Sequence, residues 1–277
     1  CVEPSSELIQ KFWECAKCQL QAIEDREEEE EEDRNEEGDA RDVMKNVCKL
    51  LYFGVVDVEL LGPQVVSHWM SYGPEVAEVV KLTYSRLKQT GNVPQGQLLL
   101  DSLIAAYERE DVDNLEREDT LLQQTSCRRL ANKLASLFAG FSYTAEDKRE
   151  VFKLVEHGLK YVLDRPEKRC YFFECALAAF TGKLAPLDAG RILSMLRDAE
   201  GDITPQYAAE VVAEYAEQIE ERSKAKVDKI LEKQLNDAAR KPSRKTEGAD
   251  GDAEEEQRDE DELEAEKADE QEEEEPE

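Results

Sequence analysis

The chain has 277 residues, of which 66 are acidic and 36 basic, so its formal net charge is −30. This balance argues against a protein that coats nucleic acid through general attraction to phosphates. No stretch approaches the roughly 18 consecutive apolar residues of a membrane span. Because the chain starts at Cys1 and no apolar signal segment follows, we expect a soluble fragment of a longer protein without a signal peptide.

The acidity is concentrated in two tracts. Residues 24–40 hold 12 acidic and 2 basic residues, and residues 241–277 hold 19 and 5, so together they carry −24 of the net charge. Both tracts are too poor in apolar residues to build a core. We therefore predict an acidic disordered loop over 24–40 and an acidic disordered tail over 241–277.

Apolar residues recur at helical spacing from residue 43 to about 237, and almost nothing alternates with period two. The spacing predicts helices from Pro74 to Thr90 and after Pro94, then others over these stretches in chain order: 121–138, 144–164, 171–184, from Pro186, and from Pro205 onward. Pro74 and Pro186 stand at first helical positions, and Thr144 with Asp147 resembles a capping box. The chain is predicted to be all-α.

Helices of this length with short connectors pack as antiparallel pairs. We expect a HEAT-like helical repeat solenoid of stacked antiparallel pairs, with a compact bundle as the alternative architecture. Residues 1–23 would form a helix of a preceding repeat, residues 41–203 the helical-repeat domain, and residues 204–240 a long charged C-terminal helix. That last helix would extend as a solvated helix, or else make a short coiled-coil contact.

No catalytic, cofactor or metal site emerges from the motifs. Cys15 and Cys18 form a CxxC pair that could be a redox or zinc half-site, but no second pair accompanies it, so two half-buried thiols are the favoured reading. The other cysteines fit reduced, buried thiols. His68 and His157 are isolated on helical patterns, which favours a solvent or packing role. The sequence has no phosphate-binding loop and no nucleophile motif.

Short basic groups could contact phosphates if packing aligned them. They comprise Arg128, Arg129, Lys133, Lys148, Arg149 and Lys153, followed by Lys168 and Arg169. Residues four apart share a helix face. Ordinary charged faces of amphipathic helices are the alternative, and with a nearly neutral body we place it first.

Several helical stretches follow one another in a distinctive order. Residues 48–57 read CKLLYFGVVD, 65–72 read VVSHWMSY, and 78–89 read EVVKLTYSRLKQ, with LANKLASLF at 130–138 and FTGKL at 180–184 further along. In this order, with an acidic tract before the first, they resemble the cohesin SA/STAG (stromal antigen) family. Its matching stretches include KLIVY-VV and LARRFALTF. One departure is the replacement of the family's Ala-Ala-Asp by Gly62-Pro63-Gln64.

The resemblance implies a non-catalytic scaffold of the cohesin complex, located in the nucleus on chromosomes. Its implied partner is the kleisin subunit, with the SMC ring and its regulators as indirect partners. It would support cohesin's association with chromatin and sister-chromatid cohesion, without a membrane or a small-molecule substrate.

On the implied kleisin surface, the contact candidates are Asp57, His68, Trp69 and Tyr72, with packing between repeats as the alternative for Trp69. Candidates for contact with DNA or an acidic partner are Arg128, Arg129, Lys133, Lys148 and Arg149. A second hypothesis is an acidic adaptor or histone-chaperone-like protein that binds basic partners through its Glu-rich tail.

Overall fold

The computed structural model describes residues 5–29, 37–90, 94–110, 124–138, 143–201 and 203–240. The chain divides into two compact units, Cys1–Leu231 and Glu232–Glu277. Within the second unit, only the last residues of one helix are described. The tail predicted over 241–277 lies outside the described residues.

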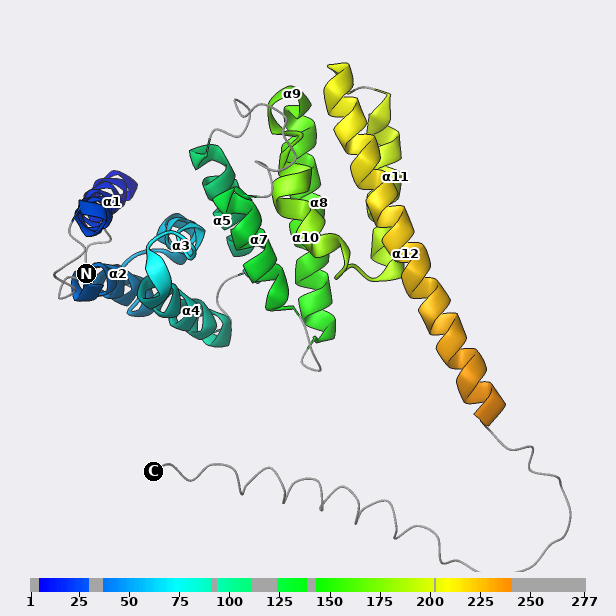
Figure 1. Cartoon of the computed structure of the whole chain (residues 1–277), viewed down its shortest axis with the longest axis horizontal. Coiled ribbons are helices and arrows are strands. Elements are labelled where there is room, and N and C mark those ends of the chain that lie inside the picture. The colour runs from blue at the N-terminus through cyan, green and yellow to red at the C-terminus, as the bar shows by residue number, and fades with distance from the viewer. Residues whose placement is uncertain are drawn as a thin grey trace, which may run out of the picture. The chain divides into compact units, whose positions relative to one another are not determined.

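Helices and the turns between them make up the described part of the chain, and no strand occurs there (Figure 1). The elements are α1 (Ser6–Glu29), α2 (Glu37–Tyr52), α3 (Val58–Ser67), α4 (Gly73–Thr90), α5 (Gln95–Arg109), α7 (Ser126–Ser136), α8 (Ala145–Asp164), α9 (Pro166–Arg169), the π-helix η2 (Phe173–Leu177), α10 (Ala178–Thr181), α11 (Pro186–Glu200) and α12 (Gln206–Arg240). The all-α prediction is confirmed.

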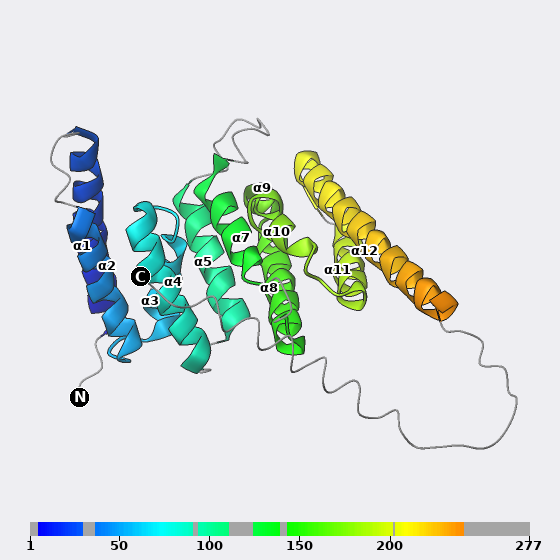
Figure 2. The ribbon, with the colours of Figure 1, turned by 60° about the horizontal axis from the view of Figure 1, so that its bottom comes forward.

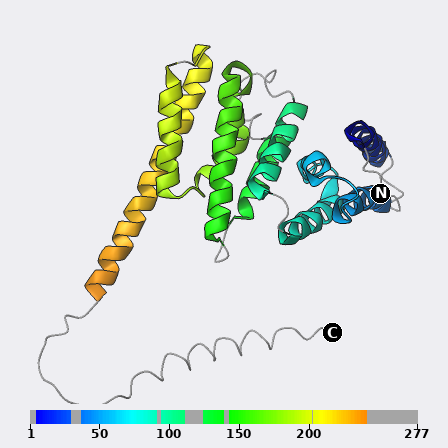
Figure 3. The same cartoon turned by 180° about the vertical axis from the view of Figure 1, so that it is seen from behind.

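Within the first unit, the helices follow one another in space in nearly the order of the sequence (Figure 2). Helix α2 packs on α1 and α4, α3 packs on α5, and α5 packs on α8. Helices α11 and α12 run side by side, which Figure 3 shows from behind. Each helix buries its apolar face against its neighbours, which is the arrangement of a HEAT-like solenoid. None of the described helices is both long and apolar enough to cross a membrane.

Local capping explains where several helices begin. The Thr144 hydroxyl accepts from the Asp147 amide at 3.1 Å, and the Asp147 carboxylate accepts from the Thr144 amide at 3.0 Å, so the predicted capping box opens α8. Pro186 occupies the first turn of α11, where its missing N–H costs no hydrogen bond. Asp57 is the N-cap of α3 and accepts from the Glu59 amide at 2.9 Å.

One glycine is required by close packing between helices. Gly96, in the first turn of α5, donates its amide to the Glu150 carboxylate of α8 at 2.7 Å. A Cβ at position 96 would lie 2.6 Å from the backbone oxygen of Glu150. The two backbones can therefore approach this closely only because residue 96 has no side chain.

Some boundaries differ from the predictions. Both ends of the predicted acidic loop are helical, since α1 continues to Glu29 and α2 begins at Glu37, while residues 30–36 lie outside the described part. Glu has a high helix propensity, which explains this extension. Of the helix predicted over 121–138, residues 121–123 lie outside the described part, and α7 begins at Ser126 because Thr125 accepts from the Arg128 amide as its N-cap. The helix predicted over 171–184 contains the π-helical turn η2 and ends at Thr181.

The predicted burial of the cysteines is correct for four of them and wrong for the CxxC pair, and Cys1 lies outside the described residues. Cys48, Cys127, Cys170 and Cys175 are free and buried. Burial raises the pKa of the Cys175 thiol to about 12, so this thiol is protonated and unreactive at neutral pH. The CxxC residues Cys15 and Cys18 are exposed rather than half-buried, because α1 turns Trp13, Ala16 and Leu20 toward the core instead.

Candidate functional site

The turn between α3 and α4 lies beside a surface cavity of about 460 Å³, which we name the polar hollow. Four parts of the chain line it: α1, the α3–α4 turn, the end of α5 and the start of α7. The lining residues are Glu14, Lys17, Cys18, Gln21, His68, Met70, Ser71, Tyr72, Arg109 and Arg129. Three of them are basic and one is acidic, so the polar hollow is locally positive in a strongly acidic protein.

Arg109 of α5 holds the α3–α4 turn in place. Its guanidinium donates to the Ser67 carbonyl oxygen at 3.1 Å and to the Ser67 hydroxyl at 3.2 Å. It also lies 2.9 Å from Nε2 of His68. Since a guanidinium can only donate, Nε2 accepts and the neutral imidazole carries its proton on Nδ1.

His68 is buried, with 4% of its surface exposed. Burial, and then the charges of Arg109 and Lys17, lower the pKa of His68 to about 3. The imidazole is therefore neutral at physiological pH. Of the two roles expected for this histidine, its burial fits packing. His157, by contrast, is exposed on α8 and lies 3.1 Å from the amide oxygen of Gln97.

Aromatic contacts link the turn to α1. The His68 ring stacks on Tyr72, with centroids 5.2 Å apart and planes 18° from parallel. On its other side it meets the indole of Trp13 at 5.4 Å. His68 Nδ1 and Trp13 Nε1 are both buried, and neither has a hydrogen-bond partner among the described residues. Of these two buried donors, only that of His68 belongs to a residue that lines the polar hollow, next to Tyr72.

The four kleisin-contact candidates lie in three different places in the structure. His68 and half-buried Tyr72 line the polar hollow. Trp69 is 1% exposed and packs against Tyr84 at 5.8 Å, which fits the packing alternative and leaves its side chain no free surface. Asp57 is exposed at the opposite end of α3, about 15 Å away at 1.5 Å per residue, with its carboxylate capping the helix.

The five basic candidates also lie in different environments. Arg129 is exposed on α7, lines the polar hollow and forms no ion pair with any described residue. Arg128, one position earlier, turns inward and donates to the Glu174 carbonyl oxygen, so it joins α7 to η2. Lys133, Lys148 and Arg149 are exposed. Lys148 lies over the Tyr143 ring at 5.7 Å.

The start of α7, and with it Arg129, is fixed by the end of α5. The Glu110 carboxylate accepts from the amides of Ser126 and Cys127, the latter at 3.1 Å. An acidic side chain at a helix N-terminus satisfies its unpaired amides and complements its dipole. Two adjacent residues therefore position this site. Arg109, the last residue of α5, holds the α3–α4 turn, and Glu110, the C-cap of α5, positions the helix that carries Arg129.

Lys17 and Arg109 were not predicted from the sequence as members of this site. Lys17 comes from α1, where it pairs with Glu14 at 2.9 Å, and Arg109 ends a helix 40 residues beyond the turn. No group of His, Cys, Asp or Glu side chains in the described part of the chain could hold a metal ion. The chemistry available at the polar hollow is binding: donors and cations that can receive carbonyl oxygens and acidic side chains.

Comparison with known proteins finds similarity to one family. Residues 92–215 match the family described as STAG protein C-terminal domain. The curated relative "Sister-chromatid cohesion protein 3" from Arabidopsis thaliana is 27% identical over 206 residues, which cover 72% of this chain and 18% of the relative. The chain thus spans less than a fifth of that relative's length, and no solved structure matches it significantly. The residues that match the STAG C-terminal domain run from the start of α5 into α12, and they include the stretches 130–138 and 180–184 that resemble SA/STAG proteins.

Proposed function

We propose that this chain is a non-catalytic scaffold segment of cohesin that binds the kleisin subunit. It would thereby support cohesin's association with chromatin and sister-chromatid cohesion, in the nucleus on chromosomes. The match to the STAG C-terminal domain and the name of the curated relative support a role in cohesion. Because the chain covers 18% of that relative, the partners of the whole protein are part of the proposal.

The observation that carries the proposal is the composition of the polar hollow. A kleisin bound there would meet Tyr72 as an apolar and stacking surface, and Arg129 as an exposed cation. Such pairs of aromatic and arginine side chains dominate the energy of many protein interfaces. The Arg109–Ser67 hydrogen bonds hold the turn before a partner arrives, which lowers the entropic cost of binding.

Calorimetric titration of the full chain with a kleisin fragment tests this proposal. Arg129→Glu should weaken binding at least tenfold, because it reverses the charge of an exposed side chain with no structural partner among the described residues. Arg149→Glu is the matched control, since Arg149 is exposed on α8 and does not line the polar hollow. Equal affinities for the Arg129→Glu variant and the unmodified chain would exclude this surface.

Asp57 needs a different design because its carboxylate caps α3. Asn is as good an N-cap as Asp, so Asp57→Asn removes the charge and keeps the cap. A kleisin contact at Asp57 predicts weaker binding with unchanged thermal stability. Unchanged affinity would leave Asp57 as a capping residue only.

The charge of residues 241–277 favours a second function. With 19 acidic and 5 basic residues, this segment could recruit basic proteins such as histones, as an acidic adaptor would. Deleting it should abolish all partner binding if the adaptor function is the main one. Retention of kleisin binding by the shortened chain would favour the helical-repeat surface.

A further inference from the structure

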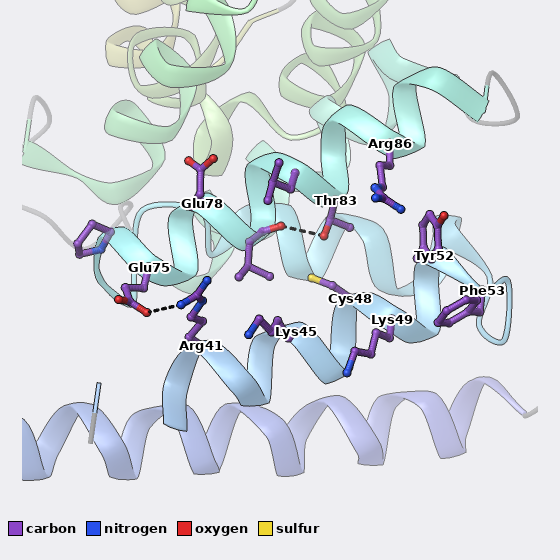
Figure 4. Close-up of a pocket in the computed structure, with 13 residues that line it drawn as sticks. Arg41, Lys45, Cys48, Lys49, Tyr52, Phe53, Glu75, Glu78, Thr83 and Arg86 are labelled. Carbon is purple, nitrogen blue, oxygen red and sulfur yellow. Dashed lines mark hydrogen bonds and ion pairs between the residues drawn. The ribbon is translucent and has the colours of Figure 1, made fainter. Parts of the chain in front are cut away.

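A second and larger concave surface lies between α2 and α4, on different elements from the polar hollow (Figure 4). We name it the α2–α4 groove. Its volume is about 690 Å³, and it is lined by Arg41, Lys45, Cys48, Lys49, Tyr52, Phe53, Pro74, Glu75, Glu78, Val79, Leu82, Thr83 and Arg86. The proposed kleisin contact at the polar hollow does not use it.

Large apolar side chains are exposed along this groove. Phe53 is 71% exposed, Leu82 56% and Tyr52 47%. The buried side chains of Cys48 and Val79 form part of its floor. An exposed apolar cluster with a polar rim is typical of a protein interaction site rather than of ordinary surface.

The charges around these apolar side chains are mostly positive. Lys45 and Lys49 project from α2, and Arg86 projects from α4 above Tyr52, with its guanidinium 4.6 Å from the ring centroid (Figure 4). Lys49 donates to the neutral amide oxygen of Asn46 at 3.1 Å and forms no ion pair with a described residue. The end of the groove that carries Tyr52 and Phe53 therefore has an excess of positive charge.

The acidic lining residues stand at the other end and are already neutralised. Glu75 pairs with Arg41 at 3.4 Å, and Glu78 pairs with Lys81 at 3.1 Å. Uncompensated positive charge thus lies beside the exposed aromatic rings, in a protein of net charge −30. Charge complementarity selects an acidic occupant for that end, and the exposed apolar surface selects one with a large apolar side chain.

We propose that the α2–α4 groove binds a short acidic segment of a partner protein that carries an aromatic or leucine side chain. The apolar side chain inserts between Phe53 and Leu82, and flanking carboxylates pair with Lys49 and Arg86. The site is separate from the polar hollow, so it can be occupied together with a kleisin. The segment acts as a regulatory ligand that recruits its protein to the scaffold.

Panning of a phage-displayed library of random dodecapeptides against the full chain tests this proposal. Selected peptides should be acidic and contain Phe, Trp or Leu, and a synthetic copy should bind at least tenfold more weakly to the Lys49→Glu and Leu82→Ser variants in fluorescence anisotropy. Lys160→Glu, an exposed lysine on α8, is the control for charge and should leave the affinity unchanged. Failure to select peptides, selection without an acidic bias, or equal affinities for all variants would overturn the proposal.

The chain's own acidic tail is the competing occupant. Full chain carrying photoreactive benzoylphenylalanine in place of Leu82 distinguishes the two by the position of the cross-link. Cross-linking to the selected peptide supports an external ligand. Cross-linking to residues 241–277 that the peptide cannot displace would overturn it, because the groove would then be closed by the chain itself.

Discussion

The two ends of the helical repeat differ in how their surfaces are closed. Around η2 and α12, the aromatic side chains Phe172, Phe173, Phe180 and Tyr215 are fully buried, although Leu187 and Tyr207 are exposed on α11 and α12. Around α1 to α4, the polar hollow and the α2–α4 groove open to solvent, and Tyr52 and Phe53 remain exposed. The difference suggests a division of labour in which the C-terminal end supplies rigidity and the N-terminal end supplies binding surface.

The packing of α12 illustrates the sealed end. Tyr215 stacks on Phe173 at 4.5 Å. One turn and more beyond, Arg222 donates to the Ala178 carbonyl oxygen at 2.9 Å and to the Thr181 hydroxyl, and Lys226 donates to the Leu184 carbonyl oxygen at 2.7 Å. Basic side chains of α12 thus donate to carbonyl oxygens of α10 and of the turn that follows it. The charged face of this helix is partly structural.

Two leucine-to-alanine substitutions, one in the core and one in the α2–α4 groove, should differ most in their effect on stability. Leu154→Ala, in the core of α8, should lower the free energy of unfolding by about 2–5 kcal/mol because it leaves a cavity. Leu82→Ala, in the α2–α4 groove, should change it by less than about 1 kcal/mol because that side chain is largely in water. Urea denaturation followed by circular dichroism measures both. Similar losses would mean that the groove is filled in solution.

The contact between α5 and α8 gives the next largest effect. Gly96→Ala should lower the free energy of unfolding by about 1–3 kcal/mol, since the added Cβ meets the backbone of Glu150, which cannot rotate away. Gly182→Ala is the control, because a Cβ there has no neighbour within 4 Å and its φ of −66° suits alanine. Thermal melts of the two variants should diverge, and coincident melts would contradict the close approach.

Replacing Arg222 tests whether α12 is attached through hydrogen bonds. Arg222→Met should lower the free energy of unfolding by about 1–2 kcal/mol, because it removes the charged donor of two hydrogen bonds, while the Ala178 carbonyl oxygen keeps the Thr181 hydroxyl as a donor. Arg197→Met should cost less than about 0.5 kcal/mol, since Arg197 forms only an exposed pair with Glu220 at 3.5 Å. Urea denaturation measures both losses. Equal losses of unfolding free energy for the two variants would show that the Arg222 contact contributes no more than an exposed ion pair.

The buried imidazole predicts a pH dependence at the N-terminal end. The pKa of His68 falls from 6.5 to about 3 on folding, so below pH 6.5 the unfolded chain binds a proton that the folded chain does not. Stability should therefore fall as the pH drops from 6.5 toward 3, by up to about 1.4 kcal/mol per pH unit from this group.

The variant His68→Gln isolates this effect, because glutamine keeps an acceptor for Arg109 but does not titrate. Between pH 7 and pH 5, the unmodified chain should lose more unfolding free energy than His68→Gln. Parallel losses in the two proteins would show that His68 is protonated in the folded chain.

Local features of the fold could be predicted from sequence, since their determinants lie within a few residues. The capping box at Thr144 and the proline start of α11 need only neighbouring backbone groups, and the buried stripe of α4 follows the helical period. The π-helical turn at Phe173 was missed because no local residue marks it. Cys18 was placed wrongly because it stands at the edge of the buried face of α1.

The candidate site could be predicted only in part, because packing brings it together from four elements. His68 and Tyr72 were predicted as kleisin contacts and Arg129 as a contact for DNA or an acidic partner, and all three line the polar hollow. Lys17 and Arg109 join these residues because α1 and α5 pack around the α3–α4 turn. The spacing of residues in the sequence does not predict that packing. The same holds for Arg128, whose helical period does not reveal that it turns toward η2.

Hydrogen–deuterium exchange of the full chain, with and without a kleisin fragment, tests the central claim most directly. Kleisin should slow amide exchange in residues 13–21 of α1, in the α3–α4 turn at 67–72 and at the start of α7, and leave α8 and α11 unchanged. Protection confined to α8–α12, or no protection at the polar hollow under saturating kleisin, would contradict the assignment of binding to the N-terminal end.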